Sequence, residues 1–254
     1  MRKFCRGEIG SEWKKSFRDA DIRGEYPNQI NEEVAYRVAR SFVQIFRLTI
    51  ILVGRDIRLS SPSLSDAFIC GASVSGCNVI DLGLIDTPGL YFASGSYHEF
   101  GVMITASHNP PQYNGMKLVK SGAIPLSNST GLLQIMNLVE QDSFTSVLNK
   151  PGQVIEKDIS QEYALYVQSK IKINDVPRQI RCVIDFGNGM SSTFAHILKN
   201  PRYHLDIKEL FSDLDGSFPN RGSDPNQKKN QHAIVNELKA GEYDFGVAFD
   251  GRKE

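Results

Sequence analysis

The sequence predicts an α/β protein built from two consecutive three-layer domains with mixed sheets. Apolar, β-branched runs alternate along the chain with segments of helical pattern, as in proteins whose strands and helices interleave in layers. The chain has 254 residues, 41% hydrophobic and 23% charged, which is enough for one large or two ordinary globular domains. Residues 141–158 contain Pro151 and Gly152 and show no clear period, which indicates a connection between domains at residues 1–150 and 151–254.

The first domain is predicted from a strand, loop and helix that follow one another. Residues 48–54 form an apolar, β-branched run that ends in glycine, which favours a strand. A helix is expected at residues 62–75, with Ser60 or Ser61 as its N-cap and Pro62 in its first turn. The same alternation continues to the end of this domain. Further strands are predicted at residues 78–84, 101–106 and 116–120, and further helices at residues 88–95 and 126–139.

The second domain is predicted to repeat this order loosely. The predicted strands are residues 181–185, 205–211 and 243–249, and the predicted helices are residues 160–171, a segment after Gly189 and a segment that ends at Ala240. A polar stretch at residues 212–230, rich in Gly, Asn and Asp, is expected to be a loop.

The strongest functional signal is the string from Gly101 to Lys117, which reads GVMITASHNPPQYNGMK. It places Ser107 on a loop directly after an apolar strand. Pro110 and Pro111 lack amide donors and hold an extended path, so no helix can begin there. Ser107 is therefore expected to be fixed and exposed, as a reactive hydroxyl is usually presented. A serine beside a histidine in a turn is by itself most often structural, and only the whole string favours a catalytic role for Ser107.

Three further segments carry a family resemblance. They are FRDADIRG at residues 17–24, VGRDIRLS at residues 53–60 and DFGNG at residues 185–189. Together with the string around Ser107, they occur in the order of the motifs of the α-D-phosphohexomutase superfamily, the phosphomannomutases and phosphoglucomutases. The phosphoserine loop of that superfamily reads T-A/G-S-H-N-P-P-x-Y-N-G-x-K. The chain resembles the superfamily from about residue 17 to residue 250.

The resemblance implies an isomerase that is an intramolecular phosphotransferase. In that superfamily a phosphoserine passes its phosphoryl group to a hexose monophosphate, and the resulting hexose 1,6-bisphosphate turns round and returns its other phosphoryl group. Ser107 would be the carrier, and hexose phosphates with hexose 1,6-bisphosphate would be the ligands. The reaction would interconvert hexose 1-phosphate and hexose 6-phosphate. Such a transfer requires a hydroxyl, positive charge against the phosphoryl oxygens and a proton acceptor.

Three cationic side chains are candidates for contact with phosphate. Lys117 stands where the superfamily has a lysine, and its ammonium could neutralise phosphate charge or assist proton transfer, although a lysine near a loop is commonly a solvated surface charge. Arg23 could present its guanidinium fork to phosphate oxygens, and Arg18 is a second candidate. For both arginines the alternative is a structural pair with Asp21.

Four more residues are candidates near these motifs. Arg55 and Arg58 flank Asp56 after a predicted strand, where α/β folds often bind ligands, so they could bind phosphate or could lock the loop. His108 could orient the phosphate or hydrogen-bond the backbone. Asn109, in the same loop, is assigned to phosphate binding by the resemblance.

The resemblance also implies a magnesium site. The metal loop of the superfamily reads D-G-D-x-D-R after an apolar strand, because carboxylates and the serine phosphate suit a hard cation such as Mg²⁺. Ser107 and Asp250 are the implied metal ligands here. Arg252 stands at the second aspartate position and would repel a cation, and Glu254 stands at the third. We therefore expect weak Mg²⁺ binding.

The resemblance further implies that the chain holds the superfamily's first domain and an incomplete, truncated second domain. The parts that select the sugar and hold the non-reacting phosphate would lie beyond the matched region, so we expect impaired turnover. The rival hypothesis is a non-catalytic remnant that binds phosphosugars weakly or acts as an interaction module, with self-association through surface left bare by the missing domains. A serine hydrolase is disfavoured because Ser107 lacks a G-x-S-x-G elbow.

Composition indicates which classes of partner and which cellular compartment are expected for this chain. The 29 basic and 29 acidic residues balance, so no net field would draw the chain to nucleic acid or to an anionic membrane. The first sixteen residues lack an apolar targeting core and no run of eighteen apolar residues occurs, which favours the cytoplasm. Together with the resemblance, the absence of metal-binding spacing predicts free thiols at Cys5, Cys70, Cys77 and Cys182.

Overall fold

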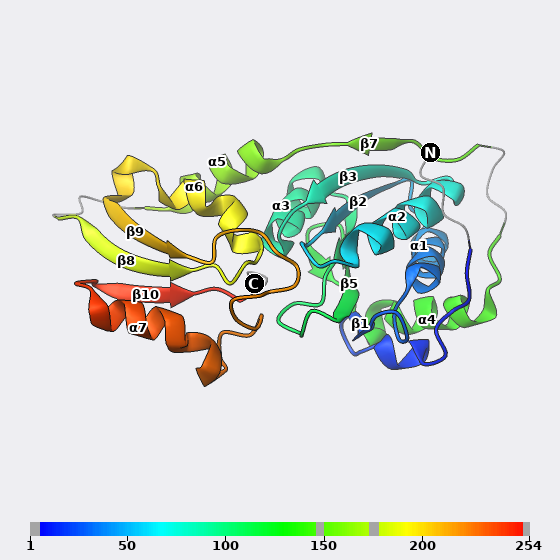
Figure 1. The fold of residues 1–254 in the computed structure, drawn as a ribbon. Helices are drawn as coiled ribbons and strands as arrows, with labels where there is room; N and C mark the ends of the chain where they lie inside the picture. The colour runs from blue at the N-terminus through cyan, green and yellow to red at the C-terminus, as the bar shows by residue number, and fades with distance from the viewer. Residues whose placement is uncertain (1–5, 146–149, 173–177, 251–254) are drawn as a thin grey trace. The chain divides into compact units, whose positions relative to one another are not determined.

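The computed structural model describes residues 6–145, 150–172 and 178–250. The chain divides into two compact units. The first contains Met1–Ala106 and Gln112–Ile159, and the second contains Ser107–Pro111 and Ser160–Glu254. The strand and helix order along each unit can be followed in Figure 1.

A mixed sheet forms the centre of the first unit. In the described residues it contains seven strands in the order β1-β5-β4-β2-β3-β7, with β6 paired to β5. The pairs β2–β3, β2–β4 and β3–β7 are parallel, whereas β1–β5, β4–β5 and β5–β6 are antiparallel. The strands are β1 (Ile22–Glu25), β2 (Ile50–Arg55), β3 (Asn78–Leu84), β4 (Phe100–Ile104), β5 (Tyr113–Lys120), β6 (Ile124–Pro125) and β7 (Val154–Glu156).

Helices cover both faces of this sheet. They are α1 (Glu32–Phe46), α2 (Ser61–Val74), α3 (Thr87–Tyr97) and α4 (Leu132–Gln141). Ile51 and Val53 of β2 face the core shared with α1, α2 and α4, whereas Leu90 of α3 lies beside Gly54 and Gly101 on the other face. This alternation along the strands produces the predicted three layers in the first unit.

Local signals fix where these helices begin. The side chain of Asn31 accepts a hydrogen bond from Val34 N at 3.1 Å at the start of α1. Asp86 accepts from Gly89 N at 2.7 Å at the start of α3. Ser60 is the N-cap of α2, as one of the two predicted candidates, although its side chain makes no capping bond. Pro62 occupies the first turn, where its missing amide costs nothing.

The second unit has a parallel sheet in its described residues. Its strands are β8 (Ile180–Asp185), β9 (Leu205–Leu210) and β10 (Phe245–Ala248), in the order β10-β8-β9. Its helices are α5 (Ser160–Lys170), α6 (Ala195–Leu198) and α7 (His232–Ala240), with 3₁₀ turns at Met190–Phe194, Pro201–Tyr203 and Lys228–Gln231. Cys182, Ile184 and Phe186 form a core with Ala195 on one face, and Ile234 of α7 packs beside Gly246. The predicted pair of consecutive α/β domains is confirmed. The first has the predicted mixed sheet, whereas the described strands of the second, also predicted to be mixed, are parallel.

Several elements differ from the sequence-based prediction. No element is predicted between the segments at residues 17–24 and 48–54, yet α1 lies there. Strand β7 lies within residues 141–158, which were expected to be a connection, and it belongs to the first sheet through its pairing with β3. The helix expected after Gly189 begins as a 3₁₀ turn at Met190–Phe194 before α6.

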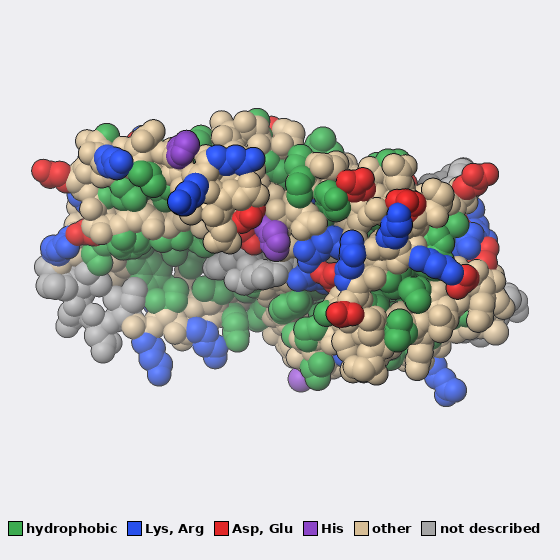
Figure 2. Space-filling model, turned by 90° about the horizontal axis from the view of Figure 1, so that it is seen from below, with side chains coloured by type: hydrophobic (Ala, Val, Ile, Leu, Met, Phe, Trp, Pro, Cys, Tyr) green, Lys and Arg blue, Asp and Glu red, His purple; other side chains and the backbone are tan. Residues whose placement is uncertain are grey.

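Several charged side chains of the described residues form ion pairs. Arg6 and Arg37 both contact the buried carboxylate of Glu33, and Arg178 pairs with Asp244. Figure 2 shows basic and acidic side chains beside one another on the face that it presents. Within the described residues, every helix is too short or too polar to cross a bilayer. Cys70, Cys77 and Cys182 are free thiols, as predicted, and Cys5 lies outside the described residues.

Candidate active site

Ser107 lies three residues after the end of β4 and is the first residue after the segment Met1–Ala106 of the first unit. Its backbone has a φ of 60°, a left-handed conformation that is uncommon for a residue with a side chain and that often marks a functional site. Its Oγ lies 3.2 Å from Nδ1 of His108. The prediction that Ser107 is exposed is wrong, because the side chain is 1% exposed. The loop Ser107–Pro111 groups with the second unit.

His108 is the exposed neighbour of that hydroxyl. In the tautomer that carries its proton on Nε2, Nδ1 accepts the Ser107 hydroxyl proton across the 3.2 Å contact. The sequence leaves two roles for His108, orientation of phosphate or a hydrogen bond to the backbone. In the structure its Nδ1 contacts the Ser107 hydroxyl, and the phosphate role stays a prediction. Asn109 is half-buried in the same loop.

A buried polar network supports the strand that leads to Ser107. The carboxylate of Asp56 accepts hydrogen bonds from Thr105 Oγ1 at 2.6 Å and from Ser61 Oγ at 2.5 Å. The amide of Asn114 donates to the same Ser61 at 3.0 Å. Asp56 and Thr105 are each 2% exposed. A carboxylate buried to this degree must be held by donors, so the network fixes the end of β4 against α2 and β5.

Arg58 belongs to this network. Its Nε lies 3.3 Å from Oδ2 of Asp56, its Nη1 donates to the Tyr113 carbonyl at 3.0 Å, and it is 1% exposed. These contacts support the loop-locking alternative for Arg58 rather than phosphate binding, because the guanidinium is enclosed by protein partners. Arg55 is half-buried, and its phosphate role stays a prediction.

Arg23 and Lys117 project from one face of the first sheet. Arg23 of β1 pairs with Gly115 of β5, and Lys117 follows two residues later on β5, where it pairs with Met103 of β4. Because side chains two residues apart on a strand point to the same face, both cations lie on that face. Arg23 also pairs with Asp21, the structural alternative considered for it.

Arg18 lies in the turn that precedes β1. Its amide donates to the Asp21 carbonyl at 2.9 Å, and its side chain is exposed. Lys117 is half-buried. The geometry is compatible with phosphate contact at Arg18, Arg23 and Lys117, and those roles stay predictions.

Asp250 is the last described residue and is half-buried at the end of the segment after β10. Within the described residues, no group of three or more His, Cys, Asp or Glu side chains is placed to hold a metal ion. Arg252 and Glu254 of the predicted cation loop lie outside the described residues. Asp250 is the part of the predicted cation loop that the structure describes, and its role as a metal ligand stays a prediction.

Two functional candidates in the second unit were not predicted from the sequence. Ser223 and Arg221 lie in the polar stretch at residues 212–230, where the composition indicates only a loop. Ser223 contacts the loop that carries Ser107, and Arg221 pairs with Asp185. Only the DFGNG segment at residues 185–189, which contains Asp185, gave a local signal for this region.

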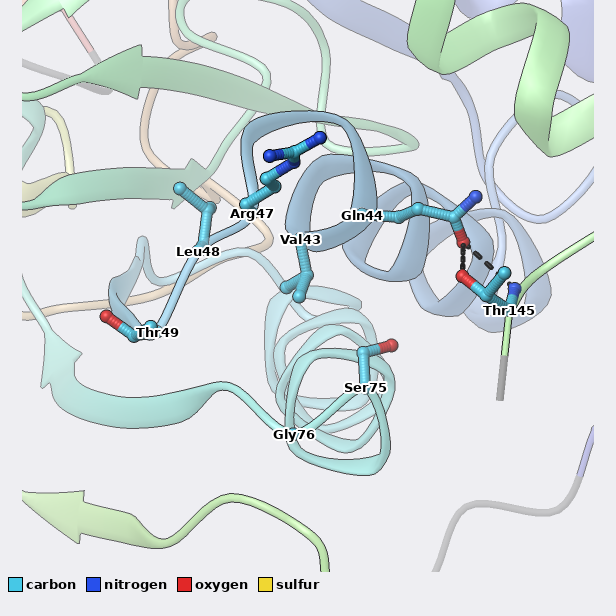
Figure 3. A pocket seen from close by; sticks show the side chains of 8 residues that line it. All are labelled: Val43, Gln44, Arg47, Leu48, Thr49, Ser75, Gly76 and Thr145. Carbon is cyan, nitrogen blue, oxygen red and sulfur yellow. Dashed lines mark hydrogen bonds between the residues drawn. The ribbon is translucent and has the colours of Figure 1, made fainter. Parts of the chain in front are cut away.

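A cavity of about 300 Å³ lies elsewhere in the first unit (Figure 3). It is lined by the ends of α1 and α2 and by residues before β2, including Arg47, Thr49 and Ser75. Gln44 and Thr145 are hydrogen-bonded at its rim, 3.0 Å apart. The cavity lies where β2 begins. Because β2 and β4 are parallel, it lies at the opposite end of these strands from the carboxyl end of β4. It is therefore separate from the candidate active site.

Comparison with protein families decides the identity of both units. Residues 14–146 match the model described as phosphoglucomutase/phosphomannomutase, alpha/beta/alpha domain I, and residues 161–252 match domain II of the same family. The chain belongs to the phosphoglucomutase/phosphomannomutase family. The superfamily resemblance carried by the four motifs is thus confirmed.

Relatives of this family cover most of the chain. A phosphoglucomutase of Neisseria meningitidis serogroup B is 37% identical over 239 residues, which are 92% of this chain and 50% of that protein. A phosphomannomutase of Escherichia coli is 32% identical over 92% of this chain and 53% of that protein. The crystal structure of a phosphoglucomutase/phosphomannomutase family protein from Burkholderia thailandensis superposes with a TM-score of 0.82 at 31% identity, over 94% of this chain and 53% of that one. The chain spans about half the length of the curated relatives it matches.

Proposed function

We propose that this member of the phosphoglucomutase/phosphomannomutase family acts as a phosphohexomutase in which Ser107 carries the phosphoryl group. The observation that supports this most directly is the left-handed Ser107 at the end of β4, with Oγ 3.2 Å from Nδ1 of His108. The ligands of the proposal are hexose 1-phosphate, hexose 6-phosphate and hexose 1,6-bisphosphate. Because the chain spans half the length of its relatives, activity of the whole enzyme is part of the proposal.

The proposed half-reaction charges the serine. Oγ of Ser107 attacks a phosphorus atom of hexose 1,6-bisphosphate, the new O–P bond forms, and the bond from phosphorus to the sugar oxygen breaks. The serine proton passes to Nδ1 of His108, the sugar oxygen takes a proton from solvent as it leaves, and His108 then returns its proton to solvent. In the reverse direction, phosphoserine gives its phosphoryl group to the free hydroxyl of a hexose monophosphate. Alternation of the two directions interconverts the two monophosphates.

Positive side chains offset the charge on the phosphoryl oxygens in this proposal. Arg23 and Lys117, which share a sheet face, are the main candidates, and Arg18, Arg55 and Asn109 are further phosphate contacts. Arg58 instead holds the loop after β2 through Asp56. These residues act by binding and orientation, which supplies much of the rate of phosphoryl transfer.

We also propose Mg²⁺ as the cation of the reaction. Asp250 and a phosphorylated Ser107 offer hard oxygen ligands, and Mg²⁺ bound there would neutralise charge on the phosphoryl oxygens. Among the described residues, Asp250 is the one carboxylate of this proposed site. The free thiols of Cys70, Cys77 and Cys182 suit a reducing compartment, and we propose the cytoplasm.

The test is the intact mass of the purified chain after incubation with hexose 1,6-bisphosphate and Mg²⁺. One added phosphoryl group, mapped to Ser107 by peptide mass spectrometry, is expected. The variant Ser107→Ala should gain none, whereas Ser217→Ala, which alters an exposed serine of the second unit, should gain one as the wild type does. His108→Ala should slow the gain, because the hydroxyl loses its proton acceptor.

The alternative is a non-catalytic module that binds phosphosugars weakly or serves as an interaction surface. No added mass in the wild type, together with calorimetric binding of hexose phosphate or with self-association in sedimentation, would favour it. Full mutase turnover is measured separately, as conversion of hexose 1-phosphate to hexose 6-phosphate by the same preparation.

A further inference from the structure

A rigid strap in the second unit holds the loop that carries Ser107. We define the strap as residues 221–224. Its middle is clamped by the side chain of Asn230, whose Oδ1 accepts from Gly222 N at 3.2 Å and whose Nδ2 donates to the Asp224 carbonyl at 2.7 Å. Asn230 is 5% exposed, and a Cβ on Gly222 would lie 2.9 Å from its Nδ2. The backbone on both sides of Ser223 is thereby fixed.

Arg221 anchors one end of the strap. Its Nε lies 2.9 Å from both carboxylate oxygens of Asp185, and these side chains are 3% and 0% exposed. Nη1 donates to the Gly222 carbonyl at 3.0 Å, and Nη2 donates to the carbonyl of Phe249. Gly187 leaves room for this guanidinium, because a Cβ there would lie 2.5 Å from Nη2. A buried pair with this many partners has one geometry, so it fixes the strap to the ends of β8 and β10.

Ser223 connects the strap to the loop. Its Oγ lies 2.6 Å from the carbonyl oxygen of His108 and 2.8 Å from that of Asn109, so its single hydroxyl proton is shared between two consecutive carbonyls. Ser223 is 4% exposed. The two prolines that follow these carbonyls lack amide protons, so the loop has few donors of its own to fix its path.

We infer that Ser223 is a positioning residue for Ser107. By holding the carbonyls of His108 and Asn109, it keeps the left-handed backbone at Ser107 and the 3.2 Å contact from Oγ to Nδ1 of His108. A left-handed serine is strained and persists only where its surroundings hold it. The effect on phosphoryl transfer rests on the proposed function, whereas the effect on the loop does not.

The experiment compares Ser223→Ala, Ser223→Thr and Ser217→Ala in the full chain. Ser223→Thr keeps the hydroxyl, and Ser217→Ala removes a hydroxyl that donates to Asp215 within the same polar stretch, 2.7 Å away. Hydrogen exchange by mass spectrometry is measured on the peptide that covers residues 101–117. The rate of phosphoryl gain from hexose 1,6-bisphosphate is measured in parallel.

For Ser223→Ala we expect loop amides to exchange about tenfold faster, equivalent to about 1.4 kcal/mol, and the phosphoryl gain to slow by a similar factor. Ser223→Thr and Ser217→Ala should behave as the wild type in both measurements. Exchange in Ser223→Ala at the wild-type rate would overturn the inference, and so would faster exchange spread over the whole second unit. If the wild type gains no phosphoryl group, the proposed function fails and the exchange comparison still decides the role of Ser223.

Discussion

The hydroxyl of Thr105 donates a 2.6 Å hydrogen bond to Oδ2 of Asp56, and both residues are buried. Thr105 lies two positions before Ser107, whereas Asp56 follows the parallel strand β2. The bond therefore links the backbone two residues before Ser107 to Asp56. The carboxylate of Asp56 also contacts Ser61 and Arg58. The bond thereby fixes the end of the segment that follows β4 within the first unit.

Removal of the Thr105 hydroxyl should destabilise the first unit. Thr105→Val keeps the shape of the side chain but leaves a buried carboxylate without one of its donors, so we expect a loss of about 1–3 kcal/mol in the free energy of unfolding. Thr105→Ser keeps the donor and should lose less. Urea unfolding followed by the fluorescence of Trp13, the single tryptophan, which is buried in the first unit, makes the measurement. Equal losses in the two variants would contradict the role of the hydroxyl.

Gly115 is required where β1 and β5 pair. A Cβ at this position would lie 2.2 Å from the Ile22 carbonyl oxygen and 2.9 Å from that of Thr105, both of them backbone atoms. Gly115→Ala should therefore lower the free energy of unfolding by about 1–3 kcal/mol through forced displacement of the strands. The matched control is Gly95→Ala in α3, where a Cβ meets nothing within 4 Å.

The control should change stability in the opposite direction. Alanine in a helix interior is favoured over glycine by about 0.5–1 kcal/mol, so Gly95→Ala should raise the urea midpoint that Trp13 reports. A Gly115→Ala chain as stable as the wild type would show that β1 and β5 can separate without cost.

The stability of the second unit should depend on pH through Asp244. Hydrogen bonds from the Arg178 side chain and then from the Arg181 amide lower the pKa of this carboxyl from 3.8 to about 2. A carboxyl whose pKa is lower in the folded chain stabilises it above its unfolded pKa, and that contribution is lost as pH falls from about 4 towards 2.

The melting temperature of Asp244→Asn should therefore lie below that of the wild type at neutral pH. The difference should shrink as the pH is lowered through the range between about 4 and 2, because the wild-type carboxylate becomes protonated and releases Arg178. Calorimetric scans of both chains at pH steps across this range make the comparison. A difference that stays constant with pH would contradict the assigned pKa.

Sequence patterns predicted most of the helices and strands, because hydrophobic periodicity and capping residues lie within each of these segments. Strand β3 has the predicted bounds, residues 78–84, and the start of α2 matches its N-cap and proline signals. Helix α1 was not predicted although its signal is present: Asn31 is an N-cap residue, and Val34, Val38 and Phe42 recur every four residues on its buried face. Strand β7 has no such signal, because its three residues are exposed and its pairing with β3 defines it.

The sequence by itself determined the family and the order of its motifs and predicted Ser107 as the phosphoryl carrier, because these are read from neighbouring residues. Tertiary structure decided what the side chains around them do. Arg58 is buried beside Asp56, and Ser223, which lies 115 residues after His108 in the chain, donates a hydrogen bond to the His108 carbonyl in the loop of Ser107. Contacts over such separations depend on how distant strands end beside one another, and a buried charge or hydroxyl takes its role from the partners that this arrangement brings to it.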